Sequence, residues 1–172
     1  QNLIDACGGL ALPGGRPWVL RIAGSGDGDY ARTLQQRAEG TVPDAGRIEW
    51  LGSIDAEART KLFADSDVLV LPSHMENFGM VVVEALAAGV PVIASDRTPW
   101  KSLEERDCGK WVPNGPESLR RAITALADAP LADMGARGRA FMEESFSWET
   151  VAGRFRELYA SMLRNGPLPG NG

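Results

Sequence analysis

The sequence predicts an α/β fold, a Rossmann-like parallel sheet with helices on both faces. Short apolar runs rich in Val, Ile and Leu alternate with longer amphipathic stretches, the pattern of parallel strands joined by crossover helices. The chain has 20 glycines and 11 prolines, more than average usage of about 7% and 5% would supply. Many turns must therefore join many short elements. A length of 172 residues is enough for one domain with a full hydrophobic core.

Four strands are expected where an apolar run ends at glycine, proline or serine, and a fifth, weaker strand follows them. Their ranges are 19–23, 48–51, 67–71, 90–94 and 110–112. Helices are expected at 30–39, 55–64, 80–88, 99–106, 116–127, 131–144 and 147–163, and a helical segment opens the chain at 2–7. Asp55 and Ser147 each stand directly before a helix, where their side-chain oxygens can accept hydrogen bonds from free amides.

Residues 1–164 contain no internal repeat, low-complexity block or linker, so we expect them to form one domain. Residues 165–172 have too little apolar content to pack and are expected to form a disordered tail. The chain begins with Gln1 rather than Met, and we expect that a preceding segment has been removed.

Charge and residue counts disfavour several classes of function. The 18 basic and 23 acidic side chains give a net charge of -5, so the whole chain has no positive field that would attract nucleic acid or anionic lipid. No apolar run approaches the ~20 residues that a membrane-spanning helix needs. His74 is the single histidine and cannot complete a zinc site with Cys7 and Cys108. The two cysteines fit a reducing compartment as core residues, with a disulfide as the less favoured alternative.

Ligands of open parallel sheets bind outside the carboxyl ends of the strands, so the strand-to-helix loops are the candidate sites. The loop that begins Gly24-Ser25-Gly26 has Asp29 where the third glycine of a dinucleotide fingerprint would fall. The chain also lacks the P-loop pattern. The glycines either let a ligand approach the backbone closely or form a plain turn.

The segment 72–92 is the most informative part of the sequence. Its helix is apolar at nearly every angle except at Glu84, so we expect a buried helix. No basic residue stands three or four positions from Glu84, so its partner is distant in sequence or is a ligand. Glu76 lies eight residues earlier, and the helix amides between the two carboxylates suit a phosphate. Alternatively, Glu76 is a solvated loop residue and Glu84 lies on a thinly exposed stripe.

Glu76 and Glu84 form an E-x7-E pair within the pattern P-S-x-x-E-x-F-G-x-x-x-x-E-A-x-A-x-G-x-P-V. This pattern resembles the C-terminal domain of GT-B glycosyltransferases, specifically the retaining nucleotide-sugar enzymes of family four, glycosyl transferases group 1. Residues 22–26 resemble the family's apolar strand ending in G-x-G, residues 50–52 its L-G turn, and residues 146–149 its closing F-S-W helix. The resemblance runs in matching order through residues 1–164 and implies the C-terminal half of a GT-B fold.

The resemblance implies a role for each matching residue. Glu84 is implied to hold the ribose hydroxyls, and Glu76 is the implied catalytic-site residue, which contacts the donor sugar near its reacting carbon. The residues implied to bind the donor sugar and diphosphate are His74, Asn77, Phe78, Gly79 and Met80, the last four through their amides. The implied nucleotide contacts are Gly24 and Gly26, with the backbone of Ser53 and Ile54 meeting the base.

The sequence also departs from the family pattern. The commoner E-G-F-G is Glu76-Asn77-Phe78-Gly79 here, and residues 98–104 replace the usual G-G-x-x-E in the loop that shapes the sugar pocket. By resemblance, the Arg and Lys that bind the diphosphate, the first strand of the sheet and the N-terminal acceptor-binding domain would all precede Gln1.

The implied activity is transfer of a sugar from a UDP- or GDP-sugar, with UDP slightly favoured, to a glycan or lipid-linked acceptor. No cofactor or metal is expected, and the fragment by itself is expected to be inactive. A cytoplasmic location is implied, with peripheral association at the inner membrane face through the missing half left open. Two alternatives remain: a non-catalytic nucleotide-binding module, and a sugar-nucleotide epimerase of the same fold, which the single His74 makes the weaker candidate.

Overall fold

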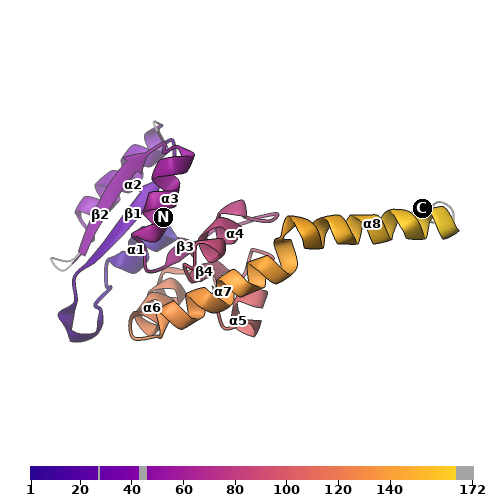
Figure 1. Cartoon of the computed structure of the whole chain (residues 1–172). Helices are drawn as coiled ribbons and strands as arrows, with labels where there is room; N and C mark the ends of the chain where they lie inside the picture. Colours follow the sequence, from indigo (N-terminus) through magenta and orange to yellow (C-terminus); the bar gives the residue numbers. More distant parts are fainter. Residues whose placement is uncertain (27, 43–45, 166–172) are drawn as a thin grey trace.

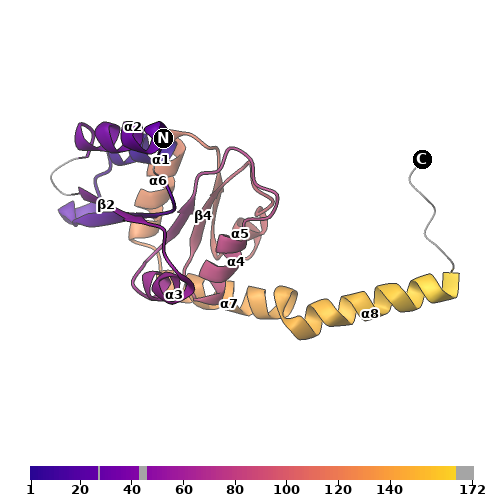
Figure 2. The same ribbon diagram turned by 90° about the horizontal axis from the view of Figure 1, so that it is seen from above.

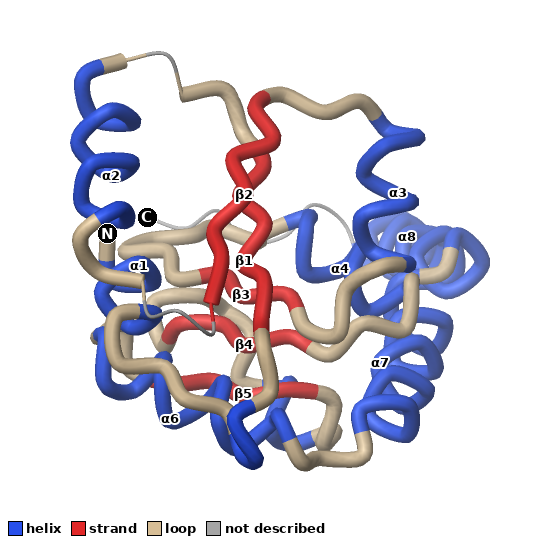
Figure 3. The backbone as a smooth tube through the Cα atoms, turned by 90° about the vertical axis from the view of Figure 1, so that its left-hand side faces the viewer, coloured by secondary structure: helices blue, strands red, loops and turns tan. Residues whose placement is uncertain are grey.

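The computed structural model describes residues 1–26, 28–42 and 46–165. Its strands form two parallel sheets (Figures 1 and 3). In the first sheet β1 pairs with β2, and in the second the order is β3-β4-β5. The strand bounds are β1 Trp18–Ala23, β2 Gly46–Gly52, β3 Leu69–Leu71, β4 Val92–Ser95 and β5 Gly109–Val112. All five predicted strands are therefore present, with ends that differ by a few residues.

The helices alternate with the strands as the sequence predicts. Their bounds are α1 Asn2–Cys7, α2 Asp29–Glu39, α3 Ala56–Ala64, α4 Met80–Ala87, α5 Ser102–Glu105, α6 Pro116–Ala127, α7 Leu131–Phe146 and α8 Trp148–Asn165, with a short 3-10 helix at Pro13–Gly15. Both predicted caps are confirmed: the Asp55 side chain accepts a hydrogen bond from the Ala58 amide, and the Ser147 hydroxyl accepts one from the Thr150 amide. The chain is thus an α/β protein.

Helices cover both faces of the three-stranded sheet. On one face Val92 of β4 packs in a core cluster with Val82 and Leu86 of α4 and with Phe141 of α7. On the other face the next residue, Ile93, packs with α1 and α6. Successive strand side chains point to opposite faces, so β4, whose residues are all buried, must be apolar throughout. The predicted arrangement of helices on both sides is confirmed.

The two-stranded sheet stands apart from the three-stranded one. Within the described residues no ladder joins β1 to β3, and the residues of β1 alternate between half-buried and exposed. Val19, on the exposed side, is 42% accessible. The expectation that an additional strand belongs beside these edges stays a prediction.

One predicted helix is much shorter than expected. The range 99–106 contains only the four-residue α5. Before it the chain turns, with the Thr98 amide bonded to the Ser95 carbonyl, and the Trp100 side chain is almost fully buried. The buried indole fixes residues 98–101 in a turn against the core. The helix therefore begins only at Ser102.

The last helix, α8, extends away from the rest of the chain (Figures 1 and 2). It carries several exposed large apolar side chains, among them Trp148, Phe155 and Tyr159. None of the helices in the described part of the chain is long and apolar enough to cross a bilayer. Of the predicted tail at 165–172, Asn165 ends α8 and the remainder lies outside the described residues.

Both cysteines are core residues, as predicted. Cys7 and Cys108 are unpaired and almost completely buried, so no disulfide joins them. Burial raises the pKa of the Cys7 thiol to about 11, although the nearby Arg120 opposes the shift. A thiol with such a pKa is protonated and unreactive near neutral pH.

Candidate functional site

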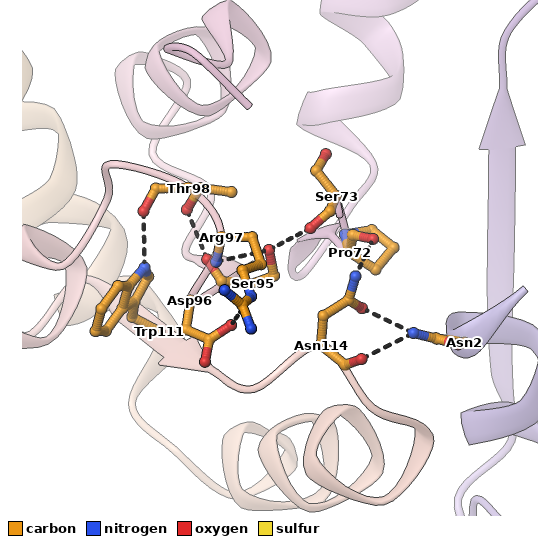
Figure 4. A network of polar contacts seen from close by, with 9 residues as sticks. All are labelled: Asn2, Pro72, Ser73, Ser95, Asp96, Arg97, Thr98, Trp111 and Asn114. Atoms are coloured by element: carbon orange, nitrogen blue, oxygen red, sulfur yellow. Dashed lines mark hydrogen bonds and ion pairs between the residues drawn. The ribbon is translucent and has the colours of Figure 1, made fainter. Parts of the chain in front are cut away.

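The loop between β3 and α4, residues 72–79, begins in a network of polar contacts at the strand ends (Figure 4). The Ser95 hydroxyl donates to the Ser73 carbonyl over 2.6 Å, and the Asn114 amide group donates to the Pro72 carbonyl over 2.9 Å. Asn114 in turn accepts through its backbone carbonyl from the Asn2 side chain. The ends of β4 and β5 therefore fix where this loop starts.

The second half of the same loop is held by the loop that follows β4. The Glu76 amide donates to the Arg97 carbonyl over 3.3 Å. The Trp100 indole donates to the Phe78 carbonyl, and the rings of Trp100 and Phe78 are 5.3 Å apart. The half-buried Glu76 thus sits on a loop whose backbone is bonded on both sides of it.

Gly79 makes the transition from this loop into α4. It is the N-cap residue, with a left-handed φ of 77°. Glycine is favoured here by its backbone conformation. A Cβ would also be crowded, since it would lie 3.2 Å from Glu76 Cγ and 3.2 Å from Leu71 Cδ2. The Val82 amide already donates to the Gly79 carbonyl over 2.9 Å. The amides of Met80 and Val81 come before any helical acceptor and lie at the positive end of the helix dipole, as an anion site needs.

Glu84 lies four residues after the start of α4, which places it about 6 Å further along the axis. Its Oε1 is 3.2 Å from Nη2 of Arg59 on α3. The expected distant partner of Glu84 is thus found within the protein. The prediction that α4 is buried all round is wrong, because Met80 is 62% exposed and the Glu84 side chain 32% exposed.

Arg59 is a site residue that the sequence alone does not identify. Glu84 has no basic neighbour on its own helix turn, which indicates a distant partner, but the chain has 18 basic residues to choose from. Only the packing of α3 beside α4 selects Arg59.

The predicted nucleotide-binding residues belong to two loops, with Gly24 and Gly26 after β1 and with Ser53 and Ile54 after β2. The Gly24 amide donates to the Gly52 carbonyl over 2.8 Å, which joins these two loops directly. Gly24, Gly26 and Ser53 are exposed and Ile54 is half-buried. Ser53 and Ile54 stand immediately before α3, whereas Gly24 and Gly26 precede α2. The α3 helix in turn reaches α4 through Arg59 and Glu84. One ion pair therefore connects the two groups of predicted site residues.

The remaining predicted residues all lie on the loop and first turn described above. His74, Asn77, Phe78 and Met80 are exposed, and Gly79 is half-buried. In the described residues no group of three or more His, Cys, Asp and Glu side chains is arranged to hold a metal ion. The expectation of a metal-free site stays a prediction.

The arrangement of an E-x7-E loop and helix at the end of a parallel strand has a counterpart in known proteins. Residues 1–141 match the model of a protein family described as glycosyl transferases group 1. The chain belongs to this family. All the candidate site residues of this glycosyl transferase fall within the matched range.

Individual relatives agree with this assignment. The chain is 32% identical over 149 residues to an uncharacterized glycosyltransferase of Methanocaldococcus jannaschii, a match of 81% of this chain and 36% of that protein. It is 31% identical over 158 residues to a phosphatidyl-myo-inositol mannosyltransferase of Mycobacterium tuberculosis, covering 86% of this chain and 39% of that protein. The chain therefore spans less than two-fifths of the length of these relatives.

A solved structure confirms the fold. The Anabaena protein HepE, crystallised with UDP-glucose, superposes with a TM-score of 0.74 at 25% identity, over 92% of this chain and 44% of that one. This group 1 glycosyl transferase thus shares its α/β architecture with about half of that GT-B-type protein.

Proposed function

We propose that this chain forms the donor-binding half of a retaining glycosyltransferase, which moves a sugar from a UDP- or GDP-sugar to a glycan or lipid-linked acceptor. The observation that carries the proposal is the geometry between Glu76 and Glu84. In a chain of this family, one carboxylate stands on a fixed loop and the second stands one helical turn beyond a free helix N-terminus.

In this proposal each part of that geometry meets one part of the donor. The Glu84 carboxylate accepts hydrogen bonds from the ribose hydroxyls, and the amides of residues 77–80 donate to oxygens of the sugar and the diphosphate. Glu76 contacts hydroxyls of the sugar near the reacting carbon. The loops that carry Gly24, Gly26, Ser53 and Ile54 flank the nucleotide, and His74 lies at the sugar end. These placements follow the order of the residues along the loop and α4.

The chemistry assigned to these residues is stabilisation of the leaving group. As the bond between the sugar carbon and the diphosphate oxygen breaks, negative charge grows on that oxygen. The amides at the start of α4 are already oriented toward such a charge, and preorganised donors of this kind commonly give the largest catalytic contribution. The acceptor hydroxyl adds to the same face of the sugar, and its proton passes to the departing diphosphate oxygen. In this proposal no metal or other cofactor takes part.

The rest of the reaction is assigned to polypeptide beyond these residues. The curated relatives are more than twice as long as the region they share with this chain, which supports the proposal of a second domain. In this proposal the second domain binds the acceptor, and further basic side chains contact the diphosphate. We place the enzyme in the cytoplasm. Contact with the inner membrane face, if the acceptor is a lipid, is assigned to that second domain.

Two donor nucleotides, UDP and GDP, are compatible with this proposal. The Anabaena relative was crystallised with UDP-glucose, which favours UDP. The Mycobacterium relative is named a mannosyltransferase, so mannose belongs among the donor sugars to be tried.

The experiment measures release of nucleoside diphosphate by the complete polypeptide that contains these residues. UDP-glucose and GDP-mannose are each supplied with and without a panel of glycan and lipid-linked acceptors. Acceptor-dependent release with one donor supports the transferase. Nucleotide binding without release under any of these conditions would instead indicate a nucleotide-binding module, and appearance of an isomeric nucleotide-sugar would indicate an epimerase.

A further inference from the structure

The ion pair between Arg59 and Glu84 joins two helices that approach from different parts of the chain. Arg59 Nη2 and Glu84 Oε1 are 3.2 Å apart, and the two side chains are 44% and 32% exposed. A pair this accessible to water contributes little to the stability of a fold. Stabilisation of the fold by itself therefore explains little of why Arg59 contacts Glu84.

The position of Arg59 is set by the packing of α3. Phe63, one helical turn later on the same face of α3, is buried in the core cluster that contains Val82 and Leu86 of α4. Anchoring of Phe63 turns the face that carries Arg59 toward α4. Arg59 is thus held where its guanidinium can reach across to Glu84.

The acidic residues nearest to Arg59 on its own helix already have partners. The Asp55 carboxylate caps the helix by accepting from the Ala58 amide over 2.8 Å. Glu57 pairs with Lys61 at 2.7 Å. The guanidinium of Arg59 therefore pairs across to a neighbouring helix, whereas Lys61 pairs within α3.

We propose that Arg59 is a positioning residue for nucleotide binding, which holds the Glu84 carboxylate oriented toward the ribose. The inference rests on the proposed function, in which Glu84 accepts hydrogen bonds from the ribose hydroxyls. A carboxylate has about four acceptor positions on its two oxygens. Contact of Arg59 with Oε1 leaves the other positions of Glu84 for the two hydroxyls.

Ligand binding strengthens the reason for this contact. A bound nucleoside covers Glu84 and removes water from it, and loss of water disfavours the charged carboxylate. An adjacent guanidinium offsets that penalty, and the attraction between the two charges grows as water leaves. The contact between Arg59 and Glu84 is therefore more stabilising in the nucleotide complex than in the free protein.

The test compares ribose-dependent affinity in matched variants of the complete polypeptide. Calorimetry measures the dissociation constants of UDP and GDP and of their 2′,3′-dideoxy analogues, which offer Glu84 no hydroxyl. Arg59→Met keeps most of the apolar stem and removes the charge. Lys61→Met is the control, because it removes a positive charge from the same helix without touching Glu84.

Arg59→Met is expected to weaken binding of the preferred ribonucleotide about tenfold, the scale of one hydrogen bond to a charged group. The affinity of Arg59→Met for the dideoxy analogue should stay close to that of the wild type. Lys61→Met should bind every ligand with wild-type affinity. If Arg59→Met does not fold, Arg59→Lys replaces it, because lysine keeps the charge but lacks the planar guanidinium. Arg59→Lys should show a smaller loss of affinity, which again depends on the ribose hydroxyls.

Equal weakening of both analogues, an affinity equal to that of Lys61→Met, or tighter ribonucleotide binding would overturn the role of Arg59. The proposed function has its own distinguishable failure: wild-type protein that binds neither UDP nor GDP overturns both together. Wild-type binding that depends on Glu84 but not on Arg59 overturns the inference about Arg59 alone.

Discussion

The backbone amide of Glu76 donates a hydrogen bond to the carbonyl of Arg97, with nitrogen and oxygen 3.3 Å apart. This bond ties the loop after β3 to the loop after β4 at the residue whose side chain is proposed to meet the donor sugar. The carboxylate of Glu76 is therefore positioned by backbone structure on both loops. A substitution that disturbs either loop should lower the rate of sugar transfer and leave the rest of the fold in place.

The indole of Trp100 gives one such test. Trp100→Phe keeps an aromatic ring beside Phe78 but removes the donor to the Phe78 carbonyl. Trp100 is buried in the core cluster, so the substitution leaves a carbonyl without its donor and a smaller ring in a packed site. We expect the free energy of unfolding to fall by about 1–3 kcal/mol, and turnover to fall with it. Urea unfolding measures the first and nucleoside diphosphate release the second. Trp148→Phe is the control, since Trp148 is 85% exposed; equal effects of the two substitutions would contradict the anchoring role.

Gly79 gives a second test at the start of α4. Gly79→Ala places a Cβ 3.2 Å from Glu76 Cγ in a residue with a φ of 77°, and a left-handed conformation costs an ordinary residue about 1–2 kcal/mol. We expect a loss of stability of that size and weaker binding of nucleotide-sugar. Gly153→Ala on α8 meets no atom within 4 Å and should be neutral or slightly stabilising. A Gly79→Ala protein with unchanged stability and unchanged binding would show that the junction between the loop and α4 does not require glycine.

Glu76 is expected to separate turnover from nucleotide affinity. Its proposed contact is to the sugar and not to the nucleotide, so Glu76→Ala should lower kcat far more than it lowers affinity for the nucleoside diphosphate. Steady-state kinetics with the nucleotide-sugar and calorimetry with the product measure the two quantities. Equal losses in both would reassign Glu76 to nucleotide binding, and loss of folding would make it a structural residue.

The order of elements could be predicted from the sequence because each strand and helix has a local signal. β4 is a short apolar run with every residue buried, and α3 and α8 begin after residues whose side chains cap them. The end of β4 and the start of α5 were harder to place, since burial of Trp100 is a tertiary effect. A helical pattern beginning at Pro99 does not show that the indole is anchored to another loop.

The candidate site was predictable where one continuous segment carries it. Glu76, Gly79 and Glu84 lie on a single loop and helix, and the absence of a local partner for Glu84 pointed beyond its own helix. The contact with Arg59 and the bond between Gly24 and Gly52 join residues from separate elements. Pairings of that kind depend on packing, which spacing along one chain does not contain.

The split between the two sheets leads to a prediction about the isolated chain. Strand edges without partners destabilise a sheet and favour pairing with other strands, and β1 is not laddered to β3 in the described residues. We expect the 172 residues by themselves to transfer no sugar. Addition of the proposed N-terminal half, with the additional strand that we expect there, should raise the Tm and restore some activity. Robust acceptor-dependent transfer by the purified chain alone would contradict this division of the site.

The proposed contact of Glu84 with the ribose is tested most directly by the affinity of the complete polypeptide for UDP and GDP, with Glu84 intact and with Glu84→Gln. We expect one of the two nucleotides to bind and the substitution to weaken its binding by about 1–3 kcal/mol, because hydrogen bonds to a charged acceptor are lost. Circular dichroism should show an unchanged fold, since the Arg59 contact is exposed and worth little to stability. Unchanged affinity for the bound nucleotide would contradict the claim and leave Glu84 as a residue of the helix surface.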